Sequence, residues 1–154
     1  MKVTDPRAMN ETFARAFNSR NISNLIALYE PGAMLRVDAS DRTLIGTGQI
    51  AAELSTLLHV TGTMISNNIF CIEQGDLALL RADWKLVADD GSVIVSGSSA
   101  EIVRRQSDGS WLYVIDHATG SHPPSPRDNK PSHDEASLEL TKSELTKAGT
   151  TIDP

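Results

Sequence analysis

Residues 79–86 read LLRADWKL, and the alternation within this stretch decides the fold class. In a β-strand, successive side chains point to opposite sides. One side would then carry the charged residues Arg81, Asp83 and Lys85, and the other the apolar residues Leu80, Ala82, Trp84 and Leu86. The charged side of a half-buried antiparallel strand ordinarily faces water, so the alternation alone favours a solvated charged face over a polar pocket.

Extended patterns continue on both sides of this stretch. Beyond Thr61 the apolar period changes from helical to extended, which predicts strands over residues 63–73, 77–87, 93–106 and 110–117. Turn signals separate them, namely GlnGlyAsp at 74–76, AspAspGly at 89–91 and SerAspGlySer at 107–110. Connections this short join antiparallel neighbours, so we expect an antiparallel arrangement in the C-terminal half.

The N-terminal half has helical spacing instead. A helix is predicted from residue 5 to about residue 17, with apolar residues at 9, 13, 16 and 17. A second helix is capped by Asn21 or Ser23 and ends before Pro31, a short strand follows over 33–37, and Thr47 caps a third helix. Helix, helix, strand, helix and four strands make an α+β layout, in which helices pack on one face of a curved sheet.

The composition is that of one globular domain with a tail. A chain of 154 residues, 40% hydrophobic and 22% charged, holds an adequate single core. The net charge of -6 argues against a nucleic-acid partner, because phosphate binding needs concentrated lysine and arginine. The N-terminus lacks a signal peptide's apolar stretch, and no apolar run reaches the roughly 20 residues that span a bilayer. We therefore expect a cytoplasmic protein with no membrane partner.

We expect the folded domain to span residues 1–118 and the rest, 119–154, to be a proline-rich linker and C-terminal tail. Ser132 and Glu135 form a capping-box pattern, which predicts a helix over about 133–147. A solvated tail is the alternative, because the apolar side of that helix, Leu138, Leu145 and Ala148, hardly offsets the ordering entropy.

Motifs for cofactors and metals are weak. Residues 45–51, IGTGQIA, satisfy the loose G-x-G-x-x-A pattern, but they precede antiparallel strands rather than forming a βαβ unit, which favours a glycine turn before a helix. The histidines at 59, 117, 122 and 133 include no close pair of the kind that metal sites use. Cys71 lies in an apolar stretch, which favours a buried, unreactive thiol. We predict no cofactor and no metal.

Charged residues recur along the predicted strands: Arg81, Asp83, Lys85, Glu101, Arg105 and Asp116. If they converge on one concave pocket, an arginine beside two carboxyls separates acid and base roles, because the arginine lowers one pKa while burial raises another. If they face water, they form a mixed-charge surface of little energetic value.

Four segments carry a resemblance to a known family: residues 13–35, 46–50, 75–84 and 104–116. Together they resemble the SnoaL-like, ketosteroid-isomerase-like proteins of the nuclear transport factor two superfamily over about residues 7–118. The resemblance implies a cone, in which a strongly bent, mainly antiparallel sheet wraps three N-terminal helices and leaves an apolar cavity at its open end. It also implies a homodimer formed through the outer sheet face.

The same resemblance implies roles for individual residues. Ketosteroid isomerase places a general base at the end of the first strand, a tyrosine on the first helix and a protonated aspartate on a later strand. Those positions hold Val37, Phe13 and Glu101 here, and Asp38 lies one residue from the base position.

Limonene epoxide hydrolase is similar in a second way, because it carries Arg-x-Asp on one strand and another aspartate on the last. By this likeness Asp116 would be the base, Asp83 the acid and Arg81 the bridge between them, with Leu35 and Val37 at the positions that orient water there. This orientation would turn Arg81 and Asp83 inward and send Leu80, Ala82 and Trp84 to the outer face. The expected substrate pocket consists of Phe13, Phe17, Leu35, Val37, Lys85 and Val103.

Two functions therefore stay open at the level of sequence. One is a cofactor-independent isomerase, cyclase or hydratase that uses paired carboxyls from Asp83, Asp116 and Glu101, with Arg81, on a small apolar substrate. The other is a noncatalytic ligand-binding or dimerisation module, in which Arg81, Asp83 and Asp116 form a structural ion-pair network.

Overall fold

The computed structural model describes residues 1–121 of the chain. The helical elements are η1 (Pro6–Ala8), α1 (Met9–Asn18), α2 (Ile22–Ile26), η2 (Asp38–Ser40) and α3 (Thr47–Leu57), η denoting 3-10 turns. The strands are β1 (Tyr29–Val37), β2 (Arg42–Ile45), β3 (Thr63–Gln74), β4 (Leu77–Val87), β5 (Val93–Ser98), β6 (Ala100–Arg105) and β7 (Trp111–His117). The predicted tail helix lies outside the described residues.

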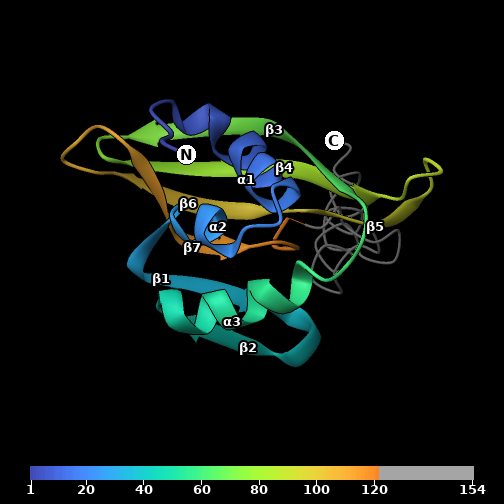
Figure 1. The fold of residues 1–154 in the computed structure, drawn as a ribbon. Helices are drawn as coiled ribbons and strands as arrows, with labels where there is room; N and C mark the ends of the chain where they lie inside the picture. Colours follow the sequence, from blue (N-terminus) through green and yellow to red (C-terminus); the bar gives the residue numbers. More distant parts are fainter. Residues whose placement is uncertain (122–154) are drawn as a thin grey trace, which may run out of the picture. The chain divides into compact units, whose positions relative to one another are not determined.

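The strands form one curved, mixed sheet with the order β2-β1-β7-β6-β4-β3, and β5 also pairs with β4. The pair β1 and β7 is parallel, and every other pair is antiparallel. Figure 1 shows α1 and α2 on one face of the sheet and α3 beside β1 and β2. The α+β class predicted from the sequence is confirmed. The parallel pair places the first strand, β1, beside the last strand, β7.

The core lies between α1 and the inner face of the sheet. On α1, Met9, Ala16 and Phe17 are fully buried, because their spacing places them on one side of the helix. Alternate residues of β4 are buried as well, namely Ala78, Leu80, Ala82 and Leu86, and Ala78, Leu80 and Leu86 belong to the same core cluster as the α1 residues. This amphipathic packing supplies most of the stabilisation of a short helix such as α1.

Of the predicted helix N-caps, the one at α2 is confirmed and the one at α3 is wrong. The Asn21 side chain accepts a hydrogen bond from Ser23 N at 2.9 Å, as expected for an N-cap. Thr47 is the first residue of α3 rather than its cap, and Gly46, with φ of 83°, occupies the cap position. The Gln49 side chain accepts from the Ile45 backbone N–H at 3.1 Å and so satisfies one donor near this helix start.

Three strand predictions were wrong in detail. The strand expected over 33–37 begins at Tyr29, because α2 ends at Ile26 and the chain is already extended before Pro31. No strand was predicted between residue 37 and Thr47, but η2 leads there into β2, which pairs with β1. The expected strand over 93–106 is split between β5 and β6 at Ser99, whose hydroxyl accepts from Ala82 N at 3.2 Å. The Ser99 side chain thus accepts a hydrogen bond from a backbone N–H of β4 that would otherwise pair with a backbone carbonyl of the neighbouring strand. The alternation of apolar and polar residues does not reveal such a side-chain hydrogen bond.

No helix within residues 1–121 is both long and apolar enough to cross a membrane.

Candidate functional site

The strand β4 has its apolar side inward. Leu80 and Ala82 are fully buried, whereas the Asp83 side chain is 52% exposed and the Arg81 side chain 31%. The orientation implied by the family resemblance, with Arg81 and Asp83 inward and Leu80, Ala82 and Trp84 outward, is therefore wrong for this chain. Burying Leu80 and Ala82 removes apolar surface from water without desolvating the charges of Arg81 and Asp83. The alternation of apolar and charged residues therefore determines which side of β4 faces the core.

Strand register places two carboxyl groups side by side on the inner face. Glu101 of β6 lies opposite Leu80 of β4 and also opposite Asp116 of β7, and Asp116 lies beside Leu35 of β1. Residues directly opposite each other on antiparallel strands have Cβ atoms about 4.5–5.5 Å apart and share a face. Glu101 and Asp116 are 3% and 7% exposed, so the pair is buried together.

A bulge in β7 gives this face its polar character. The register of β6 and β7 shifts between Ile102 and Val103, because Ile102 pairs with Ile115 whereas Val103 pairs with Tyr113. Val114 is the extra residue, and it brings Tyr113 and Asp116 onto the same face although three positions separate them. Strict alternation would have placed one of the two outside.

The Asp116 carboxyl is held by a tyrosine from the neighbouring parallel strand. The Tyr29 hydroxyl donates a hydrogen bond to Asp116 Oδ2, and both groups are buried. Burial raises the pKa of Asp116 to about 6, while the Tyr29 hydrogen bond and the nearby His117 act in the opposite direction. Burial and the adjacent Asp116 charge hold the pKa of Tyr29 well above its usual value.

The Glu101 carboxyl has weaker hydrogen-bond partners than the Asp116 carboxyl. Asn10 Nδ2 of α1 donates to Glu101 Oε2 at 3.4 Å, and Ser99 makes a second side-chain hydrogen bond. Burial, followed by the charge on Asp116, raises the pKa of Glu101 to about 8, which outweighs both hydrogen bonds. At neutral pH the pair therefore holds a protonated Glu101 beside an ionised Asp116.

Such a pair can supply one proton donor and one proton acceptor without a cofactor. Two carboxyls whose environments separate their pKa values are a recurring arrangement for acid and base roles. Burial also strengthens interactions with charge that develops on a bound molecule, because the local dielectric is low. Within residues 1–121, no three His, Cys, Asp or Glu side chains gather as a metal site would require.

The other predicted catalytic residues lie apart from this pair. Arg81 Nη2 is 3.5 Å from Asp83 Oδ1, and Ser98 Oγ donates to the same Asp83 oxygen at 2.6 Å, on the outer face. Asp83 and Asp116 thus occupy opposite sides of the sheet, and Arg81 cannot bridge them. Of the four residues implied by the resemblance, the structure brings together Glu101 and Asp116.

The expected pocket residues divide in the same way. Phe13 is half-buried and packs edge-on against Tyr113 with ring centroids 6.1 Å apart, and Val37 packs at the margin of the core. Leu35 and Val103 are buried on the inner face. Phe17 is fully buried beneath the Arg20 guanidinium, and Lys85 is exposed on the outer face, so Lys85 does not belong to the interior.

Asp38, one residue beyond the base position implied by the resemblance, belongs to an exposed cluster. His117 Nε2 lies 2.7 Å from Asp38 Oδ2, Thr119 Oγ1 donates to the same oxygen, and Arg36 Nε donates to Oδ1 at 3.2 Å. The hydrogen bonds from Thr119 and His117 lower the pKa of Asp38 to about 2. This carboxylate therefore ties the end of β1 to the end of β7 and is not a neutral-pH base.

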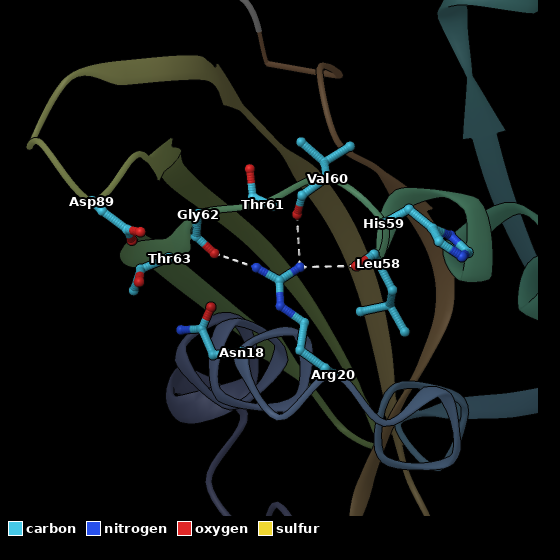
Figure 2. Close-up of a pocket in the computed structure, with 9 residues that line it drawn as sticks. All are labelled: Asn18, Arg20, Leu58, His59, Val60, Thr61, Gly62, Thr63 and Asp89. Atoms are coloured by element: carbon cyan, nitrogen blue, oxygen red, sulfur yellow. Dashed lines mark hydrogen bonds between the residues drawn. The ribbon is translucent and has the colours of Figure 1, made fainter.

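A separate pocket of about 350 Å³ lies where α1 ends near the connection between α3 and β3. Figure 2 shows Arg20 reaching into this connection, where its guanidinium donates to Leu58 O at 3.1 Å, to Val60 O at 2.8 Å and to Gly62 O. None of the predicted site residues lines this pocket. Arg20 has already satisfied the carbonyl groups around it, so its role here is to hold the loop.

The sequence did not reveal Asn10, Tyr29 or Tyr113 as members of the site. Asn10 interrupts the apolar side of α1 directly after Met9 and is only 4% exposed, which is the signal that could have identified it. Tyr113 Oη donates to Asn10 Oδ1 at 2.9 Å. Tyr29 and Tyr113 are register partners on β1 and β7, a pairing that only the parallel contact creates.

No protein-family model and no curated protein matches the sequence. Solved structures do match. A protein from Thiobacillus denitrificans, provisionally named a calcium/calmodulin-dependent protein kinase type II association domain, aligns with a TM-score of 0.66 and 20% identity over 77% of this chain and 97% of its own.

Two further structures align in the same way. A ketosteroid isomerase-like protein from Erwinia carotovora atroseptica has a TM-score of 0.59 and 19% identity over 75% of this chain and 93% of its own. An NTF2-like protein of unknown function from Pseudomonas putida has a TM-score of 0.60 and 22% identity over 80% of this chain and 88% of its own. The chain therefore has the NTF2-like fold, the fold of the nuclear transport factor two superfamily, as its sequence predicted.

Proposed function

We propose that this protein binds a small apolar molecule on the inner face of its sheet and transfers protons to and from it, with Asp116 as the base and Glu101 as the acid. The observation that carries the proposal is the pairing of these two buried carboxyls in register on β6 and β7. Their separated pKa values, about 6 and about 8, give each the protonation state its role requires near pH 7.

The surroundings of the pair support an apolar substrate. The side chains near the two carboxyls are mainly aliphatic or aromatic: Leu35 and Val103 lie on the inner face of the sheet, and Phe13 of α1 packs against Tyr113. Polar groups are few and placed at the carboxyls themselves, as in ligand sites where a small number of hydrogen bonds fix orientation. Isomerisation, cyclisation and hydration of an apolar ring compound all need one proton donor and one acceptor in this arrangement.

Proton exchange at the carbon next to a carbonyl tests this function. With 2-cyclohexenone as the probe in heavy water, the protein should accelerate the loss of the exchangeable proton signals, measured by NMR. Asp116→Asn should abolish the acceleration and retain the fold, because the amide keeps the shape but is not a base. Acceleration that survives in Asp116→Asn would contradict the assignment of the base.

The matched control is Asp83→Asn, the same change on the outer face. It should leave proton exchange unaltered, because Asp83 contacts Arg81 and Ser98 rather than the interior. A large fall in melting temperature of Asp116→Asn, with no exchange activity in the wild type, would instead favour a structural role for the Tyr29 and Asp116 pair.

A second candidate function is self-association through the outer sheet face. One observation favours it: apolar side chains at register partners form a row across six strands, namely Ile72, Leu79, Ile102, Ile115, Met34 and Ile45. Five of these six are 40–60% exposed. We define them as the outer row, and we propose a second copy of this chain as its partner, since a contiguous exposed apolar patch marks an interaction surface.

The dimensions of the outer face suit such a dimer. Strands spaced about 4.8 Å apart make six strands roughly 25–29 Å wide. Burying about 800 Å² per partner then needs roughly 30 Å along the strands, or about nine residues per strand. The strands β1, β3 and β4 reach this length with 9, 12 and 11 residues, whereas β2, β6 and β7 have 4, 6 and 7, so such a dimer would use nearly the whole outer face. Arg81 Nε, beside the outer row, is buried and without a hydrogen-bond partner within residues 1–121. The association-domain name of the similar Thiobacillus protein agrees with this candidate.

A further inference from the structure

We propose that Asn10 is the positioning residue of the carboxyl pair: Tyr113 fixes the orientation of the Asn10 amide, and the amide NH2 then holds the Glu101 carboxyl. The role of this arrangement in proton transfer rests on the proposed function, but the arrangement itself can be tested without a substrate. We call the three residues Tyr113, Asn10 and Glu101 the amide relay.

The first step of the amide relay is the hydrogen bond from Tyr113 to Asn10. The Tyr113 hydroxyl is buried, with its residue 1% exposed, and its proton is donated to Asn10 Oδ1 at 2.9 Å. If the amide rotated by half a turn, its NH2 would face the hydroxyl and the tyrosine proton would lose this acceptor. A buried donor without an acceptor is costly, so Tyr113 keeps the amide oxygen on its own side.

The second step follows from the geometry of a primary amide. With the oxygen committed to Tyr113, the NH2 group lies on the other side, where Nδ2 is 3.4 Å from Glu101 Oε2. Glu101 therefore meets a donor and not an acceptor. A donor stabilises the ionised form of a carboxyl, whereas a facing carbonyl oxygen would stabilise the protonated form.

The third step concerns the groups that oppose this donor. Asp116 of β7 is the titratable group that acts on Glu101 by its charge, and the Ser99 hydroxyl before β6 adds a hydrogen bond that works with the Asn10 donor. The charge of Glu101 in turn raises the pKa of Tyr29 on β1 and of Tyr113 on β7. Arg81 on β4 faces the other side of the sheet. Burial and the charge of Asp116 favour proton retention by Glu101, and the amide relay limits that effect, so that the proton can still leave near neutral pH.

Removing the relay should therefore raise the titration midpoint of Glu101. The experiment is a carbon-13 NMR titration of the full chain labelled at the glutamate side-chain carboxyls, in which Glu101→Gln identifies the signal by its loss. The wild-type midpoint should lie at about 8. In Tyr113→Phe the amide is free to turn its oxygen to Glu101, and the midpoint should rise by about one pH unit.

A second variant removes the donor directly. Asn10→Leu keeps the branched shape of the side chain and lacks the NH2 group, so the Glu101 midpoint should rise in it as well. These two variants act at different ends of the relay, and either one decides the question if the other destabilises the protein. A Glu101 midpoint that stays at its wild-type value in the folded variant would overturn the inference.

Tyr29→Phe is the matched control, because it deletes one buried tyrosine hydroxyl from the same site. It removes the hydrogen bond to Asp116 and should raise the Asp116 midpoint, whereas the Glu101 midpoint should not rise. A rise of the Glu101 midpoint in this control equal to that in Tyr113→Phe would contradict a specific relay.

The two proposals fail separately. Shifted Glu101 midpoints with no proton exchange in the wild type would retain the amide relay and reject the catalytic function. Unshifted midpoints with exchange that depends on Asp116 would retain the function and reject the role of Asn10.

Discussion

Two neighbouring carboxyls in a protein interior are unfavourable unless one of them is neutral. Glu101 is the one that keeps its proton, because Tyr29 donates to Asp116 and the Glu101 partners are weaker. The cost appears as a dependence of stability on pH, since a group whose pKa differs between folded and unfolded states makes folding depend on protons. This residue pair is therefore open to a test that needs no substrate.

Glu101→Gln should flatten the pH dependence of stability. The folded pKa of about 8 exceeds the unfolded value of about 4.3, so the folded state binds more protons between these values. Stability should fall as pH rises through this window, by up to ~1.4 kcal/mol per pH unit, and Glu101→Gln should lack this part of the loss. Asp116 adds a smaller loss that ends near its pKa of about 6.

Denaturant unfolding at pH 5, 6.5 and 8 measures the effect. Glu11→Gln is the control, because the Glu11 side chain is 68% exposed on α1 and the charge is solvated in both states. The wild type and this control should lose stability in parallel. Equal pH slopes for the wild type and Glu101→Gln would show that Glu101 is ionised in the folded protein.

Single residues were the hardest scale to predict from the sequence. Alternation within LLRADWKL correctly predicted that Arg81 and Asp83 face outward, and the family likeness gave the opposite answer. Glu101 and Asp116 were correctly singled out as sheet charges, but their pairing depends on register and on the Val114 bulge. Neither bulge position nor parallel pairing has a local sequence signature of the strength of a glycine turn.

At the scale of elements, helix caps offer a test with opposite expectations. Asn21→Ala should destabilise the protein by about 1 kcal/mol, because its side chain accepts from Ser23 N at the start of α2. Thr47→Ala should change stability by less than about 0.5 kcal/mol, because Thr47 lies inside α3 and makes no cap bond. Thermal or denaturant unfolding of both variants is the measurement. A cost at Thr47 equal to that at Asn21 would contradict the observed cap at Gly46.

Element boundaries were predicted where local chemistry is decisive. The strand β4 runs over Leu77–Val87 as expected, because turns with glycine limit it at both ends. The missed β2 and the break at Ser99 arise from tertiary pairing, in which β1 recruits a second strand and a serine hydroxyl enters the ladder. Sequence periodicity records burial and therefore does not record which strand supplies the partner.

At the scale of the whole molecule, the order of helices and strands predicted the α+β class, and the family resemblance of the sequence predicted the NTF2-like fold. This order restricts the topology strongly, because helices must cover one face of a sheet whose strands are joined by short turns. The other face of the sheet carries the outer row, whose side chains do not pack into the core. Its side chains are apolar at register partners, and this is a property of the assembled sheet rather than of any one strand.

Light scattering coupled to size exclusion decides whether the outer row joins two copies. The full chain should elute at twice its monomer mass, and the double variant Leu79→Lys with Ile115→Lys should elute as a monomer, because paired copies would bury four like charges at the centre of the interface. Ile94→Lys is the control: Ile94 is 46% exposed on β5 but lies outside the outer row, so this variant should remain dimeric. If the wild type remains monomeric when it is loaded at about 100 times the lowest concentration that light scattering detects, self-association is rejected. If Ile94→Lys is monomeric, the interface lies on β5 instead.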